Sequence, residues 1–224
     1  MTGGPARRER LRRPVLFGAP VLTAGVLLAH PPEPTAAADL VNVTTRWLTV
    51  HVALLFCLPL LAAAVWLLLD RIPGSAATVS RVALAGFAAL YAAFDALAGI
   101  GTGVLVREAA ALGAGDREAA MAMAERWWDM PTPLWIFAVA GPLSWVIATG
   151  AAAAAHHRAG SGLVVVAGLL IAGPLFGFGN PLITGPLAML ALLTAALLVE
   201  RRRTRVEAAQ AGRDLPAAVA RPVA

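Results

Sequence analysis

The chain has 224 residues, of which 59% are hydrophobic and only 14% are charged, and its formal net charge is +5. Soluble domains carry about 25% charged residues, and a soluble domain of this length still exposes roughly 30% of its chain surface. A soluble fold could not hide so much apolar surface, so the composition excludes an ordinary soluble domain and predicts an integral membrane protein. The single cysteine, Cys57, excludes an intrachain disulfide and a multi-cysteine metal site.

Apolar blocks along the chain predict an all-α fold, because a transmembrane helix needs about 20 largely apolar residues. The six blocks are Val15–Ala29, Trp47–Leu69, Val82–Val106, Pro133–Ala154, Leu163–Phe178 and Pro181–Val199. The first and fifth are short and need support from neighbouring helices or from local bilayer thinning. We predict a bundle of six antiparallel transmembrane helices in residues 15–200, preceded by a basic segment of residues 1–14.

Arginines in the connections predict the orientation of this bundle. Fourteen arginines fall on one side of the predicted membrane: Arg7, Arg8, Arg10, Arg12, Arg13, Arg71, Arg81, Arg158, Arg201, Arg202, Arg203, Arg205, Arg213 and Arg221. The other side has four, which are Arg46, Arg107, Arg117 and Arg126. Since cytoplasmic loops are rich in arginine, both termini are expected in the cytoplasm of a bacterial inner membrane. The cytoplasmic arginines are expected to contact anionic lipid head groups and not nucleic acid.

The first apolar block also allows a second interpretation, a cleaved signal peptide. It has a basic start, a short apolar region and a possible cleavage site at Ala36-Ala37-Ala38. Cleavage would leave five spans and place the mature N-terminus outside.

Two further segments lie outside the predicted spans. The longest outer connection, from Arg107 to Pro131, is rich in helix formers and ends near Trp127 and Trp128, residues typical of a membrane interface. It predicts a short extracytoplasmic helical segment between the third and fourth helices. Residues 201–224, with alanine, proline and scattered charges, are predicted to form a disordered cytoplasmic tail.

Asp95 is the main candidate for a functional residue, because a carboxyl group inside an apolar span is costly and should face the bundle interior or water. Helical spacing places Tyr91, Gly99 and Thr102 on the same face as Asp95. Asp95 could take part in binding or proton handling, or it could simply hydrogen-bond a neighbouring helix.

Three other polar residues are predicted near the outer ends of the spans: His30 after the first, His51 in the second, and Asn180 between the fifth and sixth. With Asp95 and Tyr91 they could form an outward-facing polar pocket, although helix rise places Asp95 about 10 Å deeper than His51. The alternative for each histidine is an ordinary hydrogen-bonded residue at the interface.

Motifs for cofactors and catalysis are weak. Two histidines with an aspartate can bind zinc, and facing histidines can bind haem, but no His-x-x-x-His spacing or cysteine pair supports either. We therefore predict no metal, no cofactor and no catalytic residue, and enzyme activity is not indicated.

His30-Pro31, followed by Arg46-Trp47 and His51, resembles a pattern in a loose group of multi-pass actinobacterial membrane proteins. These proteins have His-Pro at the end of the first helix and Arg-Trp-x-x-x-His at the start of the second. The resemblance covers about the first half of the chain and implies a helical bundle with a retained first helix. It implies no activity.

The sequence thus predicts a membrane protein that binds a small ligand, an ion or a proton in an outward-facing pocket of His30, His51, Tyr91, Asp95 and Asn180. The alternatives are a transporter or channel component and a structural subunit that binds a membrane-protein partner.

Overall fold

The computed structural model describes residues 5–129 and 134–213, and the side chains of residues 11–129 and 134–210. These residues form helices and connecting loops, with no strand among them, as the sequence predicted. The elements are α1 (Pro5–Leu28), η1 (Ala37–Leu40), α2 (Thr44–Leu68), α3 (Ser75–Phe94), η2 (Asp95–Gly101), α4 (Thr102–Ala111), α5 (Ala114–Trp128), α6 (Leu134–Arg158), α7 (Leu163–Gly177) and α8 (Thr184–Arg213).

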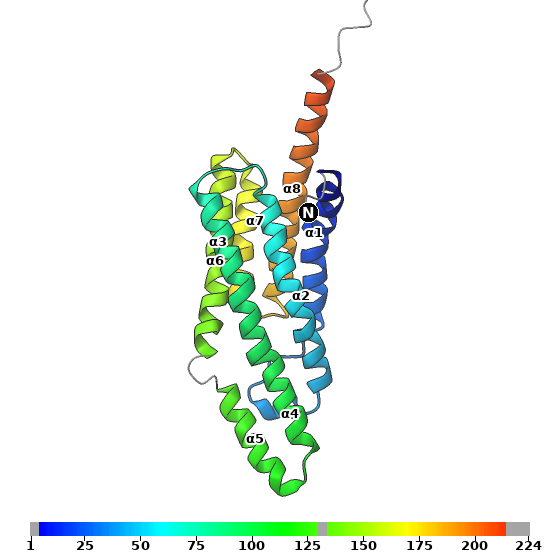
Figure 1. The fold of residues 1–224 in the computed structure, drawn as a ribbon, viewed down its shortest axis with the longest axis vertical. Helices are drawn as coiled ribbons and strands as arrows, with labels where there is room; N and C mark the ends of the chain where they lie inside the picture. The colour runs from blue at the N-terminus through cyan, green and yellow to red at the C-terminus, as the bar shows by residue number, and fades with distance from the viewer. Residues whose placement is uncertain (1–4, 130–133, 214–224) are drawn as a thin grey trace, which may run out of the picture.

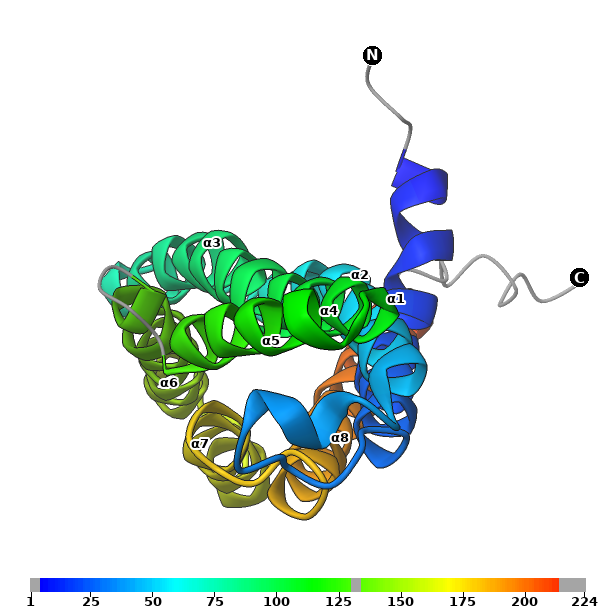
Figure 2. The same ribbon diagram turned by 90° about the horizontal axis from the view of Figure 1, so that it is seen from below.

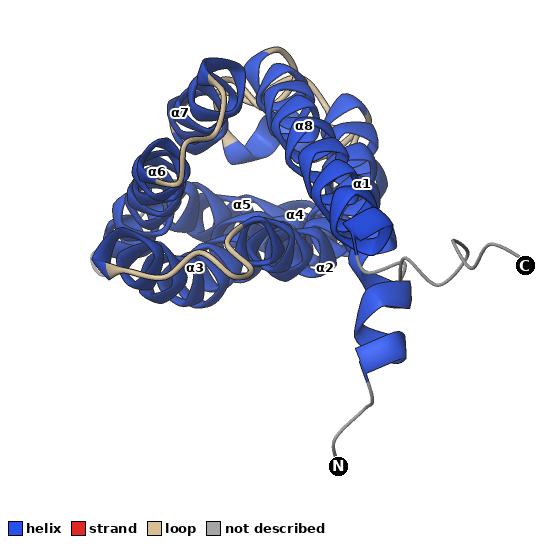
Figure 3. Cartoon of the chain, turned by 90° about the horizontal axis from the view of Figure 1, so that it is seen from above, coloured by secondary structure: helices blue, strands red, loops and turns tan. Residues whose placement is uncertain are grey.

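Six helices surround a common axis in the order α1, α2, α3, α6, α7 and α8 (Figures 2 and 3). Each helix packs against its neighbour in this order, and α8 packs against α1, so the ring is closed. The contact between α3 and α6 brings together helices that α4 and α5 separate in the sequence. The main core lies inside this ring and includes Leu61, Phe87, Trp145 and Leu192.

Five helices are long and apolar enough to cross a membrane, and α7, with 15 residues, is shorter. Large apolar side chains also cover the outside of the ring: Phe56, Val82 and Leu163 are 67%, 68% and 78% exposed. Such a surface is typical of contact with lipid and not with water. The structure is therefore compatible with an integral membrane protein.

Helices α3 and α4 form one rod with η2 between them, and the rod is longer than the predicted block Val82–Val106. It spans Ser75–Ala111, 37 residues, and α4 projects beyond the ring, where α5 folds back against it (Figure 1). Helix α5 is the helical segment that was predicted between the third and fourth apolar blocks.

The connection between α1 and α2 docks on α5 at this end of the molecule. Glu125 of α5 accepts hydrogen bonds from the backbone N–H groups of Ala37 and Ala38, at 3.0 and 2.8 Å. A small second core joins η1, α2, α4 and α5, and its buried residues are Ala37, Leu40, Trp47, Val106 and Ala124. We refer to η1, α4 and α5 together as the outer layer.

Helix α1 begins and helix α8 ends at the opposite end of the bundle, where α8 extends beyond the other helices (Figure 1). Helix α8 extends to Arg213, so the structure describes residues 201–213, which were expected in a disordered tail, as helical. Helix formers dominate this stretch, and an i,i+4 ion pair between Arg203 and Glu207, at 2.9 Å, supports it. Residues 214–224 of the predicted tail lie outside the described residues.

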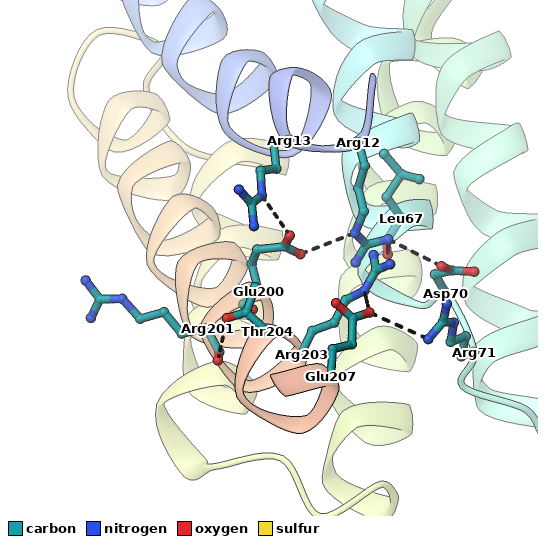
Figure 4. Close-up of polar contacts among 10 residues, drawn as sticks. All are labelled: Arg12, Arg13, Leu67, Asp70, Arg71, Glu200, Arg201, Arg203, Thr204 and Glu207. Atoms are coloured by element: carbon teal, nitrogen blue, oxygen red, sulfur yellow. Dashed lines mark hydrogen bonds and ion pairs between the residues drawn. The ribbon is translucent and has the colours of Figure 1, made fainter. Parts of the chain in front are cut away.

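An ion-pair cluster joins α1, α2 and α8 at this end (Figure 4). Arg12 donates to Glu200 at 3.2 Å and to the Leu67 carbonyl at 3.0 Å, and its guanidinium lies 3.5 Å from Asp70. Arg13 donates to the other oxygen of Glu200 at 3.2 Å. We call Arg12, Arg13, Asp70 and Glu200 the arginine cluster.

Candidate functional site

A cavity of about 320 Å³ lies where the ring meets the outer layer. Its wall is formed by the end of α1 and the loop after it, by α2, by the α3–η2–α4 rod, by the end of α5 and by the segment joining α7 to α8. The size is near the lower end of the range for small-molecule sites. Four predicted site residues, His30, His51, Tyr91 and Asp95, contribute to this wall.

His51 and Asp95 form the polar centre of the wall, and we call them the dyad. Nδ1 of His51 lies 2.7 Å from Oδ1 of Asp95, within hydrogen-bonding distance. Their side chains are only 11% and 7% exposed. Nε2 of His51 and Oδ2 of Asp95 are buried without a hydrogen-bond partner in the described part of the chain. Buried polar atoms nearly always have partners, so each such exception needs an explanation.

A π-helical segment, η2, positions Asp95 at its first residue. Single π-turns within α-helices are rare and often occur at functional sites. Two indole N–H groups donate to carbonyl oxygens of this segment: Trp47 to Gly99 at 2.6 Å and Trp127 to Leu97 at 3.0 Å. These two hydrogen bonds, one from α2 and one from α5, stabilise the π-helical segment η2.

Gly99 is required for the close approach of α2 to this segment. A Cβ atom at residue 99 would overlap the imidazole ring of His51. Only glycine therefore allows His51 to reach Asp95 across the helix contact, a use of small residues that is common in membrane bundles.

His30, Trp47 and His51 pack against one another beside the dyad. The ring centroid of His30 lies 5.2 Å from that of Trp47 and 5.3 Å from that of His51. The ring centroids of Trp47 and His51 are 4.2 Å apart. Nδ1 of His30 donates to the Pro31 carbonyl at 2.7 Å. Burial lowers the pKa of the His30 imidazole, which favours its neutral form, and the charge of Arg46 contributes in the same direction.

Arg46 caps the end of α1, where it donates to the carbonyl oxygens of Ala29 and His30 at 2.7 and 3.1 Å. A positive charge at a helix C-terminus is favourable. All the residues that carry the sequence resemblance, from His30-Pro31 to His51, therefore lie in or directly behind one wall of the cavity.

Asn180 is the one predicted site residue that does not line the cavity. Its side chain is exposed, and Oδ1 accepts hydrogen bonds from the N–H groups of Leu182 and Ile183 at 2.9 and 3.3 Å. Asn180 thus stabilises the turn that leads into α8, while its neighbours Gly179 and Pro181 contribute to the wall.

The predicted depth difference between Asp95 and His51 is wrong, because the two side chains are hydrogen-bonded. Helix rise from the ends of two apolar blocks does not give the register of the helices. In the structure Gly103 lies against Trp47, and Gly99 lies against His51. The common face of Tyr91, Asp95, Gly99 and Thr102 is confirmed, since all four line the cavity.

Several wall residues were not predicted as site residues. Trp127 and Trp128 at the end of α5 line the cavity, and Trp128 packs 6.1 Å from Trp47. Their position beside an apolar block suggested only an interface anchor. Glu33 and Phe176 also contribute, and the sequence carried no signal for either one.

Asp39 stabilises the loop that covers the cavity. Its carboxylate accepts hydrogen bonds from the hydroxyl and N–H groups of Thr35 and from the N–H of Ala36, at 2.9, 2.9 and 3.1 Å. These bonds, led by the one from the Thr35 hydroxyl, lower the pKa of Asp39.

Within residues 5–129 and 134–213, no three His, Cys, Asp or Glu side chains are grouped so that they could hold a metal ion. Comparisons of the chain with protein-family models, with curated proteins and with solved structures give no significant match. The inference of function therefore depends on the geometry of the cavity.

Proposed function

We propose that this chain is an inner-membrane protein with six transmembrane helices whose outward-facing cavity binds a small ligand, an ion or a proton at the dyad. The observation that carries this proposal is that His51 and Asp95 line the cavity and that each has a buried polar atom, Nε2 and Oδ2, without a partner in the described part of the chain. Ionisable side chains within membrane segments are rare and usually functional. A ligand that contacts these atoms would supply the missing hydrogen bonds.

The proposed topology places both termini in the cytoplasm and the outer layer outside. It is supported by the arginine-rich connections, because α1 starts, α2 ends, α6 ends and α8 ends at the same end of the bundle (Figure 1). Helix α7 is proposed as the sixth span, since it packs between α6 and α8. Its 15 residues extend only about 22 Å, so the bilayer beside it should be thinner.

Cysteine labelling in a Cys57→Ser background tests the orientation and the access to the cavity. Ala98 lines the cavity, Ala111 is exposed at the outer tip of α4, and Ala159 is exposed in the turn between α6 and α7. A membrane-impermeant thiol reagent added to intact cells should modify Ala98→Cys and Ala111→Cys but not Ala159→Cys. Inverted vesicles should reverse the pattern.

The outcome also separates the other candidate functions. Labelling of Ala98→Cys from both sides of the membrane would indicate a transporter. No labelling of Ala98→Cys from either side, with normal labelling of the two controls, would contradict a binding cavity and favour a structural subunit.

A further inference from the structure

The charged residues in the wall of the cavity are of one sign. Glu33 and Asp95 carry carboxylates, and no arginine is among the described residues of the wall. Arg46, which follows the loop after α1 and precedes Trp47, donates instead to the carbonyl oxygens of Ala29 and His30. An anionic ligand would therefore meet repulsion here without a compensating positive charge.

Hydrogen-bond acceptors dominate the polar part of the wall. His30 donates through Nδ1 to Pro31, which leaves Nε2 as an acceptor in the neutral ring. With the shared proton of the dyad on Nδ1 of His51, Nε2 of His51 and Oδ2 of Asp95 are acceptors too. The indole N–H groups of Trp47 and Trp127 already donate to backbone carbonyls. With this proton placement, a ligand that brings donors could bond to all three of these acceptors.

Aromatic rings form much of the remaining wall, with Trp47, Tyr91, Phe94, Trp127, Trp128 and Phe176. The faces of such rings attract a cation, and the attraction is stronger where water is excluded. The apolar residues Leu27, Leu54 and Leu58 complete the wall and suit the hydrocarbon part of a ligand.

We infer that the cavity takes a small organic cation with a protonated amino group, with its N–H groups toward the dyad and its apolar part among the aromatic rings. This inference rests on the proposed binding function and adds the chemical class of the ligand. A neutral apolar molecule would leave the dyad without partners, and a carboxylate or phosphate would face the carboxyl groups of Glu33 and Asp95 with no arginine in the described wall.

Three probes of similar shape and different charge test the inference: benzylammonium, benzyl alcohol and benzoate. Isothermal titration calorimetry would use the full chain in lipid nanodiscs, with empty nanodiscs to correct for partition into lipid. Benzylammonium should bind roughly 10- to 100-fold more tightly than benzyl alcohol, the range expected for hydrogen bonds to a charged group. Benzoate should show no saturable binding.

Two matched variants test whether the preference for benzylammonium over benzyl alcohol depends on Asp95. Asp95→Asn should reduce the advantage of benzylammonium over benzyl alcohol to less than about threefold, whereas Asp70→Asn, the same change at the other end of the bundle, should retain it. If Asp95→Asn does not fold, Trp128→Leu provides a second readout. This change should weaken the binding of benzylammonium about two- to fivefold more than the binding of benzyl alcohol.

The failures of the two proposals can be told apart. Equal affinities for benzylammonium and benzyl alcohol would overturn the cation inference and leave the binding function standing. Absence of binding by all three probes, with Ala98→Cys still labelled from outside, would also overturn only the cation inference. Absence of binding together with an unlabelled Ala98→Cys would overturn both proposals.

Discussion

The molecule buries charged side chains in two regions that differ in how completely they are paired. In the arginine cluster, Glu200 accepts from Arg12 through one oxygen and from Arg13 through the other, and Arg12 reaches three partners (Figure 4). In the dyad, one hydrogen bond joins His51 to Asp95, and one polar atom of each side chain has no partner among the described residues. The side chains of Arg12 and Glu200 are 5% and 8% exposed, close to the 11% and 7% of the dyad, so burial alone does not distinguish these two pairs.

The difference indicates two roles for buried polar groups. A buried ion pair is tolerated when further hydrogen bonds satisfy its remaining atoms, and the arginine cluster meets that condition for Glu200 while it holds α1 to α8. The dyad lies instead beside a cavity and retains buried polar atoms without a described partner, as the proposed binding site requires. Four changes would sharpen or break this comparison.

Glu200→Leu should have the largest effect on stability. It leaves Arg12, whose side chain is only 5% exposed, without its main partner, and removal of one member of a buried pair lowers the free energy of unfolding by about 3–5 kcal/mol. The measurement is equilibrium unfolding in detergent, with exposed Glu118→Leu as the matched control, expected within about 0.5 kcal/mol of the parent. The double variant Arg12→Leu/Glu200→Leu should recover most of the loss. A double variant as unstable as Glu200→Leu would show that the cluster is not a structural pair.

Gly99→Ala should lower stability by about 1–3 kcal/mol, the usual cost of overpacking. The new methyl group would overlap the His51 ring and force it away from Asp95, so binding of benzylammonium should be lost as well. Gly25→Ala in α1 is the matched control, because no atom lies within 4 Å of a Cβ there. It should be neutral or slightly stabilising. Equal behaviour of the two variants would contradict the close approach of α2 to η2.

Trp127→Phe should lower stability by about 1 kcal/mol, because it keeps an aromatic ring and removes the hydrogen bond to the Leu97 carbonyl. Trp128→Phe is the control, since the described contact of Trp128 is ring packing with Trp47. Thermal unfolding in the same detergent would compare them. A larger loss in Trp128→Phe would argue against a role for the indole N–H of Trp127 in stabilising η2.

The smallest effect is expected from pH. Burial lowers the pKa of His30 below 6.5, so the unfolded chain binds a proton more readily than the folded one. This contribution to stability is fully present above about pH 6.5 and is lost as pH falls through the lowered pKa. His51, Arg46 and Trp47 face His30. The fall in unfolding temperature from pH 7 to pH 5 should be smaller in His30→Gln than in the parent, and unchanged in exposed His157→Gln. If the unfolding temperature of His30→Gln fell as much as that of the parent, protonation of His30 would not be the cause of the fall.

The sequence predicted the helices and most of the polar wall because both depend on local patterns. Continuous apolar residues marked the long helices, and helical spacing placed Tyr91, Asp95, Gly99 and Thr102 on one face. The positions of His30 and His51 at the ends of apolar blocks suggested that the two could meet, and their rings are 5.3 Å apart.

The remaining features depend on contacts between distant segments, which no local pattern records. The π-helical turn at Asp95 is stabilised by Trp47, 52 residues from its carbonyl partner, and by Trp127, 30 residues from its own. The depth of Asp95 was misjudged because the ends of apolar blocks do not give the register between two packed helices, in which Gly99 lies against His51. Helical order beyond Glu200 was missed because charged residues that resemble a solvated tail also form good helices.

The bond between Arg12 and Glu200 joins residues 188 positions apart, and this separation constrains the timing of assembly. When Arg12 leaves the ribosome, its carboxylate partner has not yet been made, and the contact of α8 with α1 is still open. Phe176 and Gly185, which complete the cavity, also emerge late. Because segments fold as they are synthesised, from the N-terminus onward, Arg12 can meet Asp70 and the Leu67 carbonyl first. Its bond to Glu200 forms last, when α8 packs against α1 and completes the wall of the cavity.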